Sequence, residues 1–201
     1  MTLINCWNMM ISEGYEVDIY ISDYTNYTSK YDVQPIPNTG VVVDCVDRGI
    51  IPSFAVVDEN HVPFRVINNE HNPAVFKRQD GTRVSQCECI VYADRNDNRK
   101  GWLFFLELKY CDPKNRYSNI LEGIGQLKAT CKYILDEKKE VDGPQFKKYL
   151  VISTPGTEPL DPFDAHYFNQ DDILSIKEET GAMLRASNMA RIKTPAVVDF
   201  K

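Results

Sequence analysis

The chain of 201 residues is long enough for one domain with a single core, and its 43% hydrophobic and 26% charged content is ordinary for a globular protein. A net charge of −6 argues against a protein that coats DNA through charge alone. No apolar run approaches the roughly 18 residues that span a bilayer, and the first residues carry no export signal. We therefore expect a cytoplasmic protein with no membrane partner, whose six cysteines stay reduced.

The first third of the chain is rich in strand signals. Four segments carry the alternating or β-branched pattern of strands: 17–21, 41–46, 54–57 and 62–67. Asp58-Glu59-Asn60 separates the last two, and these turn residues predict a hairpin. Between the first two, residues 24–38 are polar and contain Tyr and Pro, which is typical of an irregular connection.

The middle of the chain has a clearer pattern. We expect a strand at 86–92, joined by a charged turn to a second strand at 102–110. A helix is predicted from about 118 to 137, because apolar residues recur there at intervals of three and four. Gly123 and Gly125 weaken that helix locally, which indicates close packing against a neighbour.

The rest of the chain predicts a strand at 148–152, a helix at 171–186 and a short strand at 196–200. The order strand, hairpin, strand, helix, strand in the centre favours an α/β fold with a mixed central β-sheet flanked by helices. We expect residues 1–63 to form a β-rich N-terminal part that packs on or extends a core of residues 64–201, within one compact domain.

Two charged residues, Glu107 and Lys109, end the most apolar of these strands. Residues two apart in a strand share a face, so both side chains project together, away from Leu106 and Leu108. Burying charged groups costs desolvation energy, which is expected where they bind a metal or do chemistry. Glu88 lies in the preceding strand and can face Glu107 through the hairpin. Two such carboxylates predict a site for a hard cation such as Mg²⁺.

The spacing Glu-x-Lys is weak evidence when taken alone. An acid two residues before a lysine recurs at Asp112, Asp136 and Glu137, in a turn and at a helix end where a solvated surface explains it. A structural ion pair is the simple alternative for Glu107 and Lys109. The apolar strand and the second acid distinguish these two from the other matches.

Taken together, these segments resemble a known superfamily. Residues 86–91, a charged loop, residues 104–109 and a helix that contains Gln126-Leu127 resemble the PD-(D/E)XK nucleases, in particular small bacterial members with a Glu-Leu-Lys motif followed by Gln-Leu. The resemblance covers about residues 64–152 and implies a restriction-endonuclease-like core.

The resemblance also implies roles for individual residues. Glu88 and Glu107 would hold Mg²⁺ or Mn²⁺ together with the backbone carbonyl of Leu108. Lys109 would orient or deprotonate the attacking water and help to neutralise the phosphate. Gln126 would face the site from the following helix.

Some positions extend the superfamily's pattern and others depart from it. Thr130 and Tyr133 share the helix face of Gln126 and could contact substrate, although Tyr133 fits the core as well. Glu88 stands where most members have Asp, and Cys87 stands where the motif has Pro. Many members add an acid from an upstream helix, for which Glu70 is the nearest candidate.

The function implied by this resemblance is a Mg²⁺-dependent phosphodiesterase that cleaves DNA with metal-activated water, and many members act as homodimers. A second hypothesis is a nuclease-fold protein that has lost catalysis and binds nucleic acid or a protein partner. The third is a small structural or interaction protein whose motif is an ion pair. No zinc-finger spacing, helix-turn-helix or basic tail indicates a separate DNA-recognition module.

Overall fold

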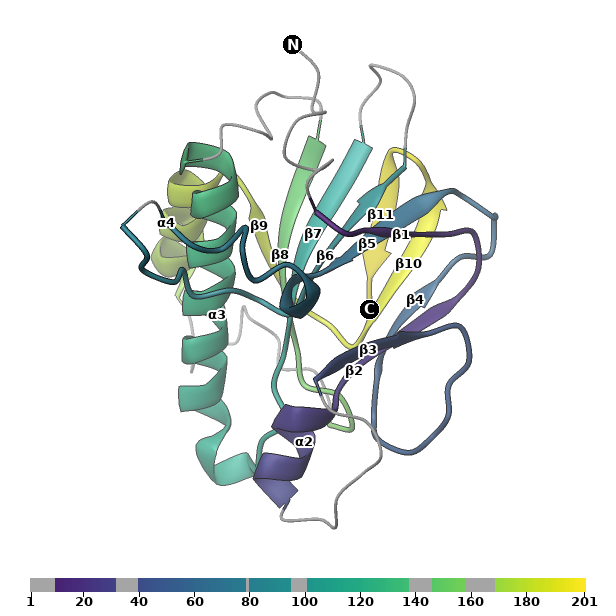
Figure 1. Cartoon of the computed structure of the whole chain (residues 1–201), viewed down its shortest axis with the longest axis horizontal. Coiled ribbons are helices and arrows are strands. Elements are labelled where there is room, and N and C mark those ends of the chain that lie inside the picture. Colours follow the sequence, from purple (N-terminus) through teal and green to yellow (C-terminus); the bar gives the residue numbers. More distant parts are fainter. Residues whose placement is uncertain (1–9, 32–39, 79, 95–100, 138–145, 158–168) are drawn as a thin grey trace.

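A six-stranded sheet and a five-stranded sheet lie face to face, and helices cover the outer face of the larger sheet (Figure 1). The computed structural model describes residues 10–31, 40–78, 80–94, 101–137, 146–157 and 169–201. Parallel and antiparallel neighbours occur in both sheets, so the fold is α/β with mixed sheets, as predicted.

The first sheet contains the strands on which the predicted site depends. In order across the sheet, its strands are β1 (Glu13–Tyr15), β5 (Phe64–Asn68), β6 (Cys89–Ala93), β7 (Gly101–Leu108), β8 (Phe146–Ser153) and β9 (Met183–Ala186). Neighbouring strands are antiparallel from β1 to β7 and parallel from β7 to β9.

The second sheet combines strands from both ends of the chain. Its order is β11 (Val197–Phe200), β10 (Met189–Thr194), β4 (Phe54–Val57), β2 (Ile19–Asp23) and β3 (Val41–Asp44). Because β4 pairs with β10 and β1 pairs with β5, segments from both sides of residue 63 contribute to both sheets.

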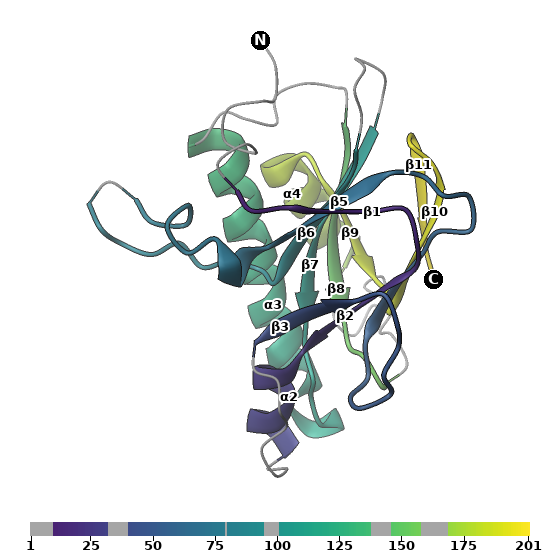
Figure 2. The ribbon, with the colours of Figure 1, turned by 45° about the vertical axis from the view of Figure 1, so that its right-hand side comes forward.

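Three α-helices are described, two of them on the outer face of the first sheet. They are α2 (Tyr24–Tyr31), α3 (Arg116–Lys132) and α4 (Gln170–Thr180), with short helical turns at Asn69–His71, Pro113–Asn115 and Tyr133–Glu137. Helices α3 and α4 cover the first sheet, whereas α2 follows β2 and lies beside the start of α3 (Figure 2). There the Lys30 Nζ donates to the Asn119 Oδ1 at 3.3 Å.

Strand β7 is buried on both faces, which explains its nearly continuous apolar sequence. Trp102, Phe104 and Leu106 pack into the core between the two sheets. Leu103 and Phe105 pack on the other face, in the core beneath α3. The predicted strand at 102–110 and the predicted helix at 118–137 are confirmed, and the charged turn between β6 and β7 lies mostly outside the described residues.

The hairpin predicted from residues 54–57 and 62–67 is wrong. Strand β4 pairs with β2 and β10, whereas β5 pairs with β1 and β6, so the turn between them carries the chain from one sheet to the other. Asp58 in that turn is buried, and its Oδ1 accepts a hydrogen bond from the Val62 N at 3.1 Å. The turn residues were correctly recognised, but they do not determine which strands pair.

The connection predicted at 24–38 is wrong in its first half, which forms α2. Asp23 Oδ1 accepts a hydrogen bond from the Asn26 N at 2.9 Å and so satisfies a free amide at the start of the helix. The polar side chain of Thr28 donates to the Tyr24 carbonyl at 2.8 Å. Residues 32–39 lie outside the described residues.

The helix predicted at 171–186 is too long. Gly181 adopts the left-handed conformation (φ 64°) and ends α4, after which residues 183–186 form β9. Strand β10 was not predicted, because Met189-Ala-Arg-Ile-Lys-Thr194 contains few residues with a strong strand preference. The short strand predicted at 196–200 is confirmed as β11.

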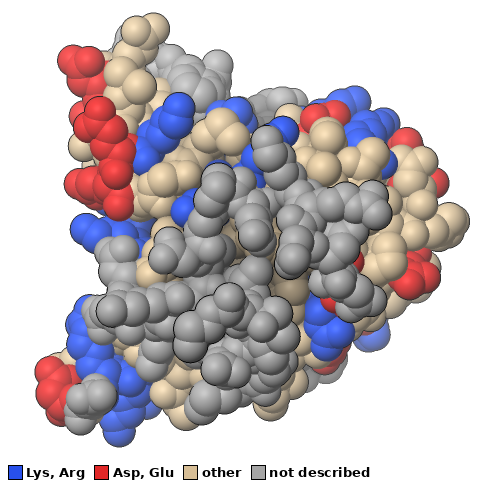
Figure 3. All heavy atoms as spheres, turned by 90° about the horizontal axis from the view of Figure 1, so that it is seen from above, with Lys and Arg blue, Asp and Glu red and all other residues tan. Residues whose placement is uncertain are grey.

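The described residues of the face seen from above include charged side chains of both signs. Lys and Arg side chains lie beside Asp and Glu side chains there, and the described part of this face carries no continuous basic surface (Figure 3).

Within the described ranges, no helix is both long and apolar enough to pass through a bilayer.

Asn188 lies where the chain passes from β9 in the first sheet to β10 in the second. Its Oδ1 accepts hydrogen bonds from the Ser153 Oγ and the Thr154 N, both at 2.9 Å, and its Nδ2 donates to the Thr157 carbonyl at 2.7 Å.

Asn188→Ala should therefore lower the free energy of unfolding by about 2 kcal/mol in a urea titration. Asn60→Ala, which removes one exposed hydrogen bond, should cost less than about 0.5 kcal/mol, and equal losses would contradict this role.

Candidate functional site

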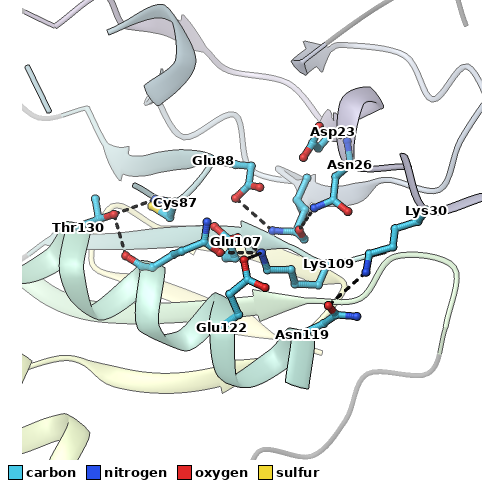
Figure 4. Close-up of polar contacts among 12 residues, drawn as sticks. Asp23, Asn26, Lys30, Cys87, Glu88, Glu107, Lys109, Asn119, Glu122 and Thr130 are labelled. Atoms are coloured by element: carbon cyan, nitrogen blue, oxygen red, sulfur yellow. Dashed lines mark hydrogen bonds and ion pairs between the residues drawn. The ribbon is translucent and has the colours of Figure 1, made fainter. Parts of the chain in front are cut away.

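Glu107 and Lys109 lie at the C-terminal end of β7, on the face that α3 covers (Figure 4). Glu107 is fully buried and Lys109 is 7% exposed. The Lys109 Nζ lies 2.8 Å from the Glu107 Oε1 and donates to the Gln126 Oε1 at 2.6 Å. The exposed carboxylate of Glu122 approaches the same ammonium to 3.7 Å. The structure thus brings together the predicted acid, lysine and glutamine.

Helix α3 passes very close to β7 at Gly123. A Cβ at Gly123 would lie 2.6 Å from the Ile152 Cδ1 and 3.1 Å from both the Glu107 Cγ and the Lys109 Cε. Because Gly123 has no side chain, the ion pair of Glu107 and Lys109 fits beneath the helix. The close packing predicted at Gly123 is therefore confirmed. The same prediction is wrong for Gly125, where a Cβ would meet no described atom within 4 Å.

Glu88 reaches the same place from the residue just before β6. Cys89 pairs with Leu106 in antiparallel register, so Glu88 stands opposite Glu107. The Glu88 Oε2 accepts a long hydrogen bond of 3.4 Å from the Leu108 N. The predicted approach of the two carboxyl groups across neighbouring strands is therefore present.

Thr130 ties the segment ahead of β6 to α3. Its Oγ1 accepts a hydrogen bond from the Cys87 N at 2.8 Å and donates to the Gln126 carbonyl at 2.9 Å. Thr130 and Tyr133 share the predicted helix face but are both buried, and the Tyr133 hydroxyl donates to the Val75 carbonyl at 2.9 Å. The core position weighed for Tyr133 is confirmed, and contact of Thr130 with a substrate stays a prediction.

Burial and mutual repulsion set the charges of the two acids. Burial, followed by the charge of the neighbouring Glu107 carboxylate, raises the pKa of Glu88 well above its usual range. Burial also raises the pKa of Glu107, although the nearby Glu88 carboxyl group and the charge of Lys109 oppose that shift. Burial alone would lower the pKa of Lys109, but its attraction to Glu107 and Glu88 raises the pKa overall. The two carboxyl groups therefore oppose each other's ionisation, and the ammonium of Lys109 offsets part of that repulsion.

The carbonyl of Leu108, the third predicted ligand, is contacted by a helix that the sequence did not predict. The Asn26 Nδ2 in α2 donates to the Leu108 carbonyl at 3.4 Å. The second sheet therefore reaches the end of β7 through the helix that follows β2 (Figure 4).

Asp23 is a further acid near the site that the sequence did not reveal. It ends β2, is 6% exposed, and donates its backbone N–H to the Tyr110 hydroxyl at 3.4 Å. Burial raises the pKa of Asp23, while the hydrogen bond from Asn26 and the charge of Lys109 lower it. Nothing in the sequence marks a single Asp after an alternating strand as a site residue, because the position of Asp23 depends on the pairing of distant strands.

Glu70, the upstream acid suggested by the resemblance, has a different partner. Its side chain is exposed, and its Oε2 accepts a hydrogen bond from the Val41 N at 2.8 Å. The carboxylate thus joins the start of β3 to the turn after β5, and the structure does not bring it into contact with Glu88.

The oxygen donors at the end of β7 suit a small hard cation. Among the described residues, no three or more His, Cys, Asp and Glu side chains form a group that could hold a metal ion. Mg²⁺ commonly uses only one or two carboxylates and keeps several waters, so Glu88, Glu107 and the Leu108 carbonyl supply a sufficient donor set. Both Glu107 oxygens are buried: Oε1 faces the Lys109 ammonium at 2.8 Å, and Oε2 accepts no hydrogen bond from the described residues. These residues therefore fit Mg²⁺ or Mn²⁺.

No protein-family model, curated protein or solved structure matches the chain. The case for a function consequently depends on the geometry and charge of this site.

The close approach at Gly123 predicts opposite effects of two neighbouring substitutions. Gly123→Ala should lower the free energy of unfolding by about 2 kcal/mol, because the new methyl group would overlap Ile152 and crowd the ion pair. Gly125→Ala should raise it by up to about 1 kcal/mol, because alanine has the higher helix propensity and the space is open. Thermal or urea unfolding of both variants measures the difference, and the same sign for both would contradict the packing described.

The raised pKa of Glu88 predicts a stability cost that grows with pH. Because its pKa is higher in the folded than in the unfolded chain, the folded state loses stability as the pH rises from the unfolded value toward the raised one. In metal-free buffer, Glu88→Gln should raise Tm by about 3 °C at about pH 8 and by much less at about pH 4. The exposed Glu178→Gln variant is the control and should change Tm little at either pH.

Proposed function

We propose that the chain is a Mg²⁺- or Mn²⁺-dependent phosphodiesterase that cleaves DNA by attack of water, built on a restriction-endonuclease-like core. The observation that carries the proposal is the approach of Glu88 to Glu107 at the end of β7, with the Lys109 ammonium 2.8 Å from Glu107. Burying an acid and a lysine beside a second, partly buried acid is costly, and this cost is expected where the charges hold a cation and do chemistry.

The order of elements around the site supports the same proposal. The antiparallel pair β6 and β7 carries the two acids, α3 follows with Gln126, and β8 then pairs parallel to β7. This order agrees with the pattern on which the resemblance to the PD-(D/E)XK superfamily depends.

In this proposal each residue has a defined task. A bound divalent cation would lower the pKa of its water ligand and stabilise negative charge on a phosphoryl oxygen. Glu88, Glu107 and the Leu108 carbonyl would hold the cation, and Thr130 keeps the segment before Glu88 in place. Lys109, oriented by Gln126, would set a positive charge beside the scissile phosphate.

The part of the chain that contains the site is more positively charged than the remainder, and this favours an anionic substrate. Residues 77–148, which contain the site, carry 15 Lys and Arg against 11 Asp and Glu, within a chain of net charge −6. Lys30 is exposed and contacts Asn119 on α3, one turn before Glu122, so a second ammonium stands near the ion pair (Figure 4). A phosphate backbone would meet positive charge here.

A nuclease-fold protein without catalysis, which binds nucleic acid or a protein partner, is the second candidate. The observation in its favour is that Lys109 already has Glu107 and Gln126 as close partners, so the ion pair is complete as a structural contact. Such a protein would bind its partner equally well with and without a divalent cation.

The test is cleavage of labelled single-stranded and duplex DNA and of RNA of the same sequence, with Mg²⁺, with Mn²⁺ and with a chelator. We expect cation-dependent cleavage of DNA, and Lys109→Met should reduce its rate by about 100-fold or more through the loss of positive charge in the transition state. Glu107→Gln should abolish both cleavage and Mn²⁺ binding, the latter measured by calorimetry.

The control variant is Lys128→Met, which removes a half-buried lysine of α3 that lies outside the proposed site. Lys128 pairs with Glu179 at 2.6 Å, away from β7, so cleavage should persist in this variant. Binding of DNA without any cleavage would favour the second candidate. If the wild-type chain neither cleaves nor binds nucleic acid, the nuclease proposal is rejected.

A further inference from the structure

Asp23 is held at the same end of the sandwich as the two acids of the proposed site. Its backbone N–H donates to the hydroxyl of Tyr110, the residue after Lys109, at 3.4 Å. Three residues further along, the Asn26 Nδ2 donates to the Leu108 carbonyl at 3.4 Å. These two contacts fix the end of β2 and the start of α2 against the end of β7, and Figure 4 shows the Asp23 side chain on the Glu88 side of Asn26.

The buried negative charge at this end exceeds the positive charge available. Asp23 is 6% exposed and has no ion-pair partner within the described ranges, and its donors are backbone amides, among them the Asn26 N at 2.9 Å. Figure 4 shows the carboxyl group of Asp23 on the same side of the end of β7 as that of Glu88, and negative charges placed there repel one another. Lys109 alone cannot neutralise three acids.

An unsatisfied buried oxygen lies in the same place. Glu107 has no exposed surface, its Oε1 has the Lys109 ammonium, and its Oε2 has no hydrogen-bond donor among the described residues. A buried oxygen without a partner costs about 1–3 kcal/mol, so its retention beside two other acids points to a cation as the missing partner.

Asp23 does not complete a group of three direct ligands, since no such group is present in the described part of the chain. Mg²⁺ keeps several of its waters when it binds to protein, and such waters need acceptors of their own. We propose that Asp23 is a positioning residue of the cation site, whose carboxylate accepts hydrogen bonds from waters on the cation held by Glu88 and Glu107. This inference rests on the proposed function and adds to it a residue of the second sheet.

The test is titration of the full-length protein with Mn²⁺ by calorimetry, together with Tm measured in chelator. Asp23→Asn keeps an acceptor for the Asn26 N but loses the charge, and it should weaken Mn²⁺ binding by about tenfold or more. Its Tm without metal should be unchanged or higher, because the substitution removes a buried negative charge. A purely structural aspartate would instead lose Tm. Asp23→Ser, which also preserves an acceptor, is the second variant if Asp23→Asn does not fold.

Asp58 offers a matched control in the same sheet. It follows β4, which is antiparallel to β2, so it lies at the opposite end of the sheet, where it is 3% exposed and accepts the Val62 N–H at 3.1 Å. Asp58→Asn should leave Mn²⁺ affinity unchanged. Equal affinities of the Asp23 variant and the wild type, a parallel loss of Tm and affinity, or an equal loss in the Asp58 variant would overturn the inference. No Mn²⁺ binding to the wild type would instead reject the proposed function itself.

Discussion

Lys109 and Glu107 form an ion pair beneath α3, where both charges have lost most of their hydration. Coulomb attraction offsets the lost hydration only when the remaining donors and acceptors of both groups also have hydrogen-bond partners. Gln126 supplies an acceptor for the ammonium, whereas the Glu107 Oε2 has no donor among the described residues. Two local features serve this ion pair. Gly123 leaves space for it beneath α3. Strand β7 ends where its residues first require polar partners.

Two layers of the molecule meet at this ion pair. From one side, α3 contributes Gln126 and, through Thr130, fixes the segment before β6. From the other side, the second sheet contributes α2, whose Asn26 contacts the Leu108 carbonyl. The charged end of β7 is therefore enclosed by elements that do not contact each other extensively, and its geometry depends on the packing of both layers against one strand.

The features that the sequence predicted correctly depend on residues close together in the chain. The apolar run of β7, its antiparallel neighbour β6 and the periodicity of α3 are local patterns, and the approach of Glu88 to Glu107 follows from the pairing of successive strands. The second sheet could not be predicted in this way, because β4 pairs with β10 and the intervening chain gives no local sign of it. Asp23 was missed for the same reason: its relevance appears only when β2 is placed beside the end of β7.

The position of β4 between β2 and β10 also determines when α2 can cover the site. As the chain emerges from the ribosome, residues 64–153 can assemble β5 to β8 and α3, with the ion pair among them. Until residues 189–200 follow, β4 has only β2 as a partner, and a sheet of so few strands is marginally stable alone. Pairing over such long separations is slow, so α2 would settle against β7 late in folding. Glu88 and Glu107 would then remain accessible to water and to cations until residues 189–200 have been synthesised.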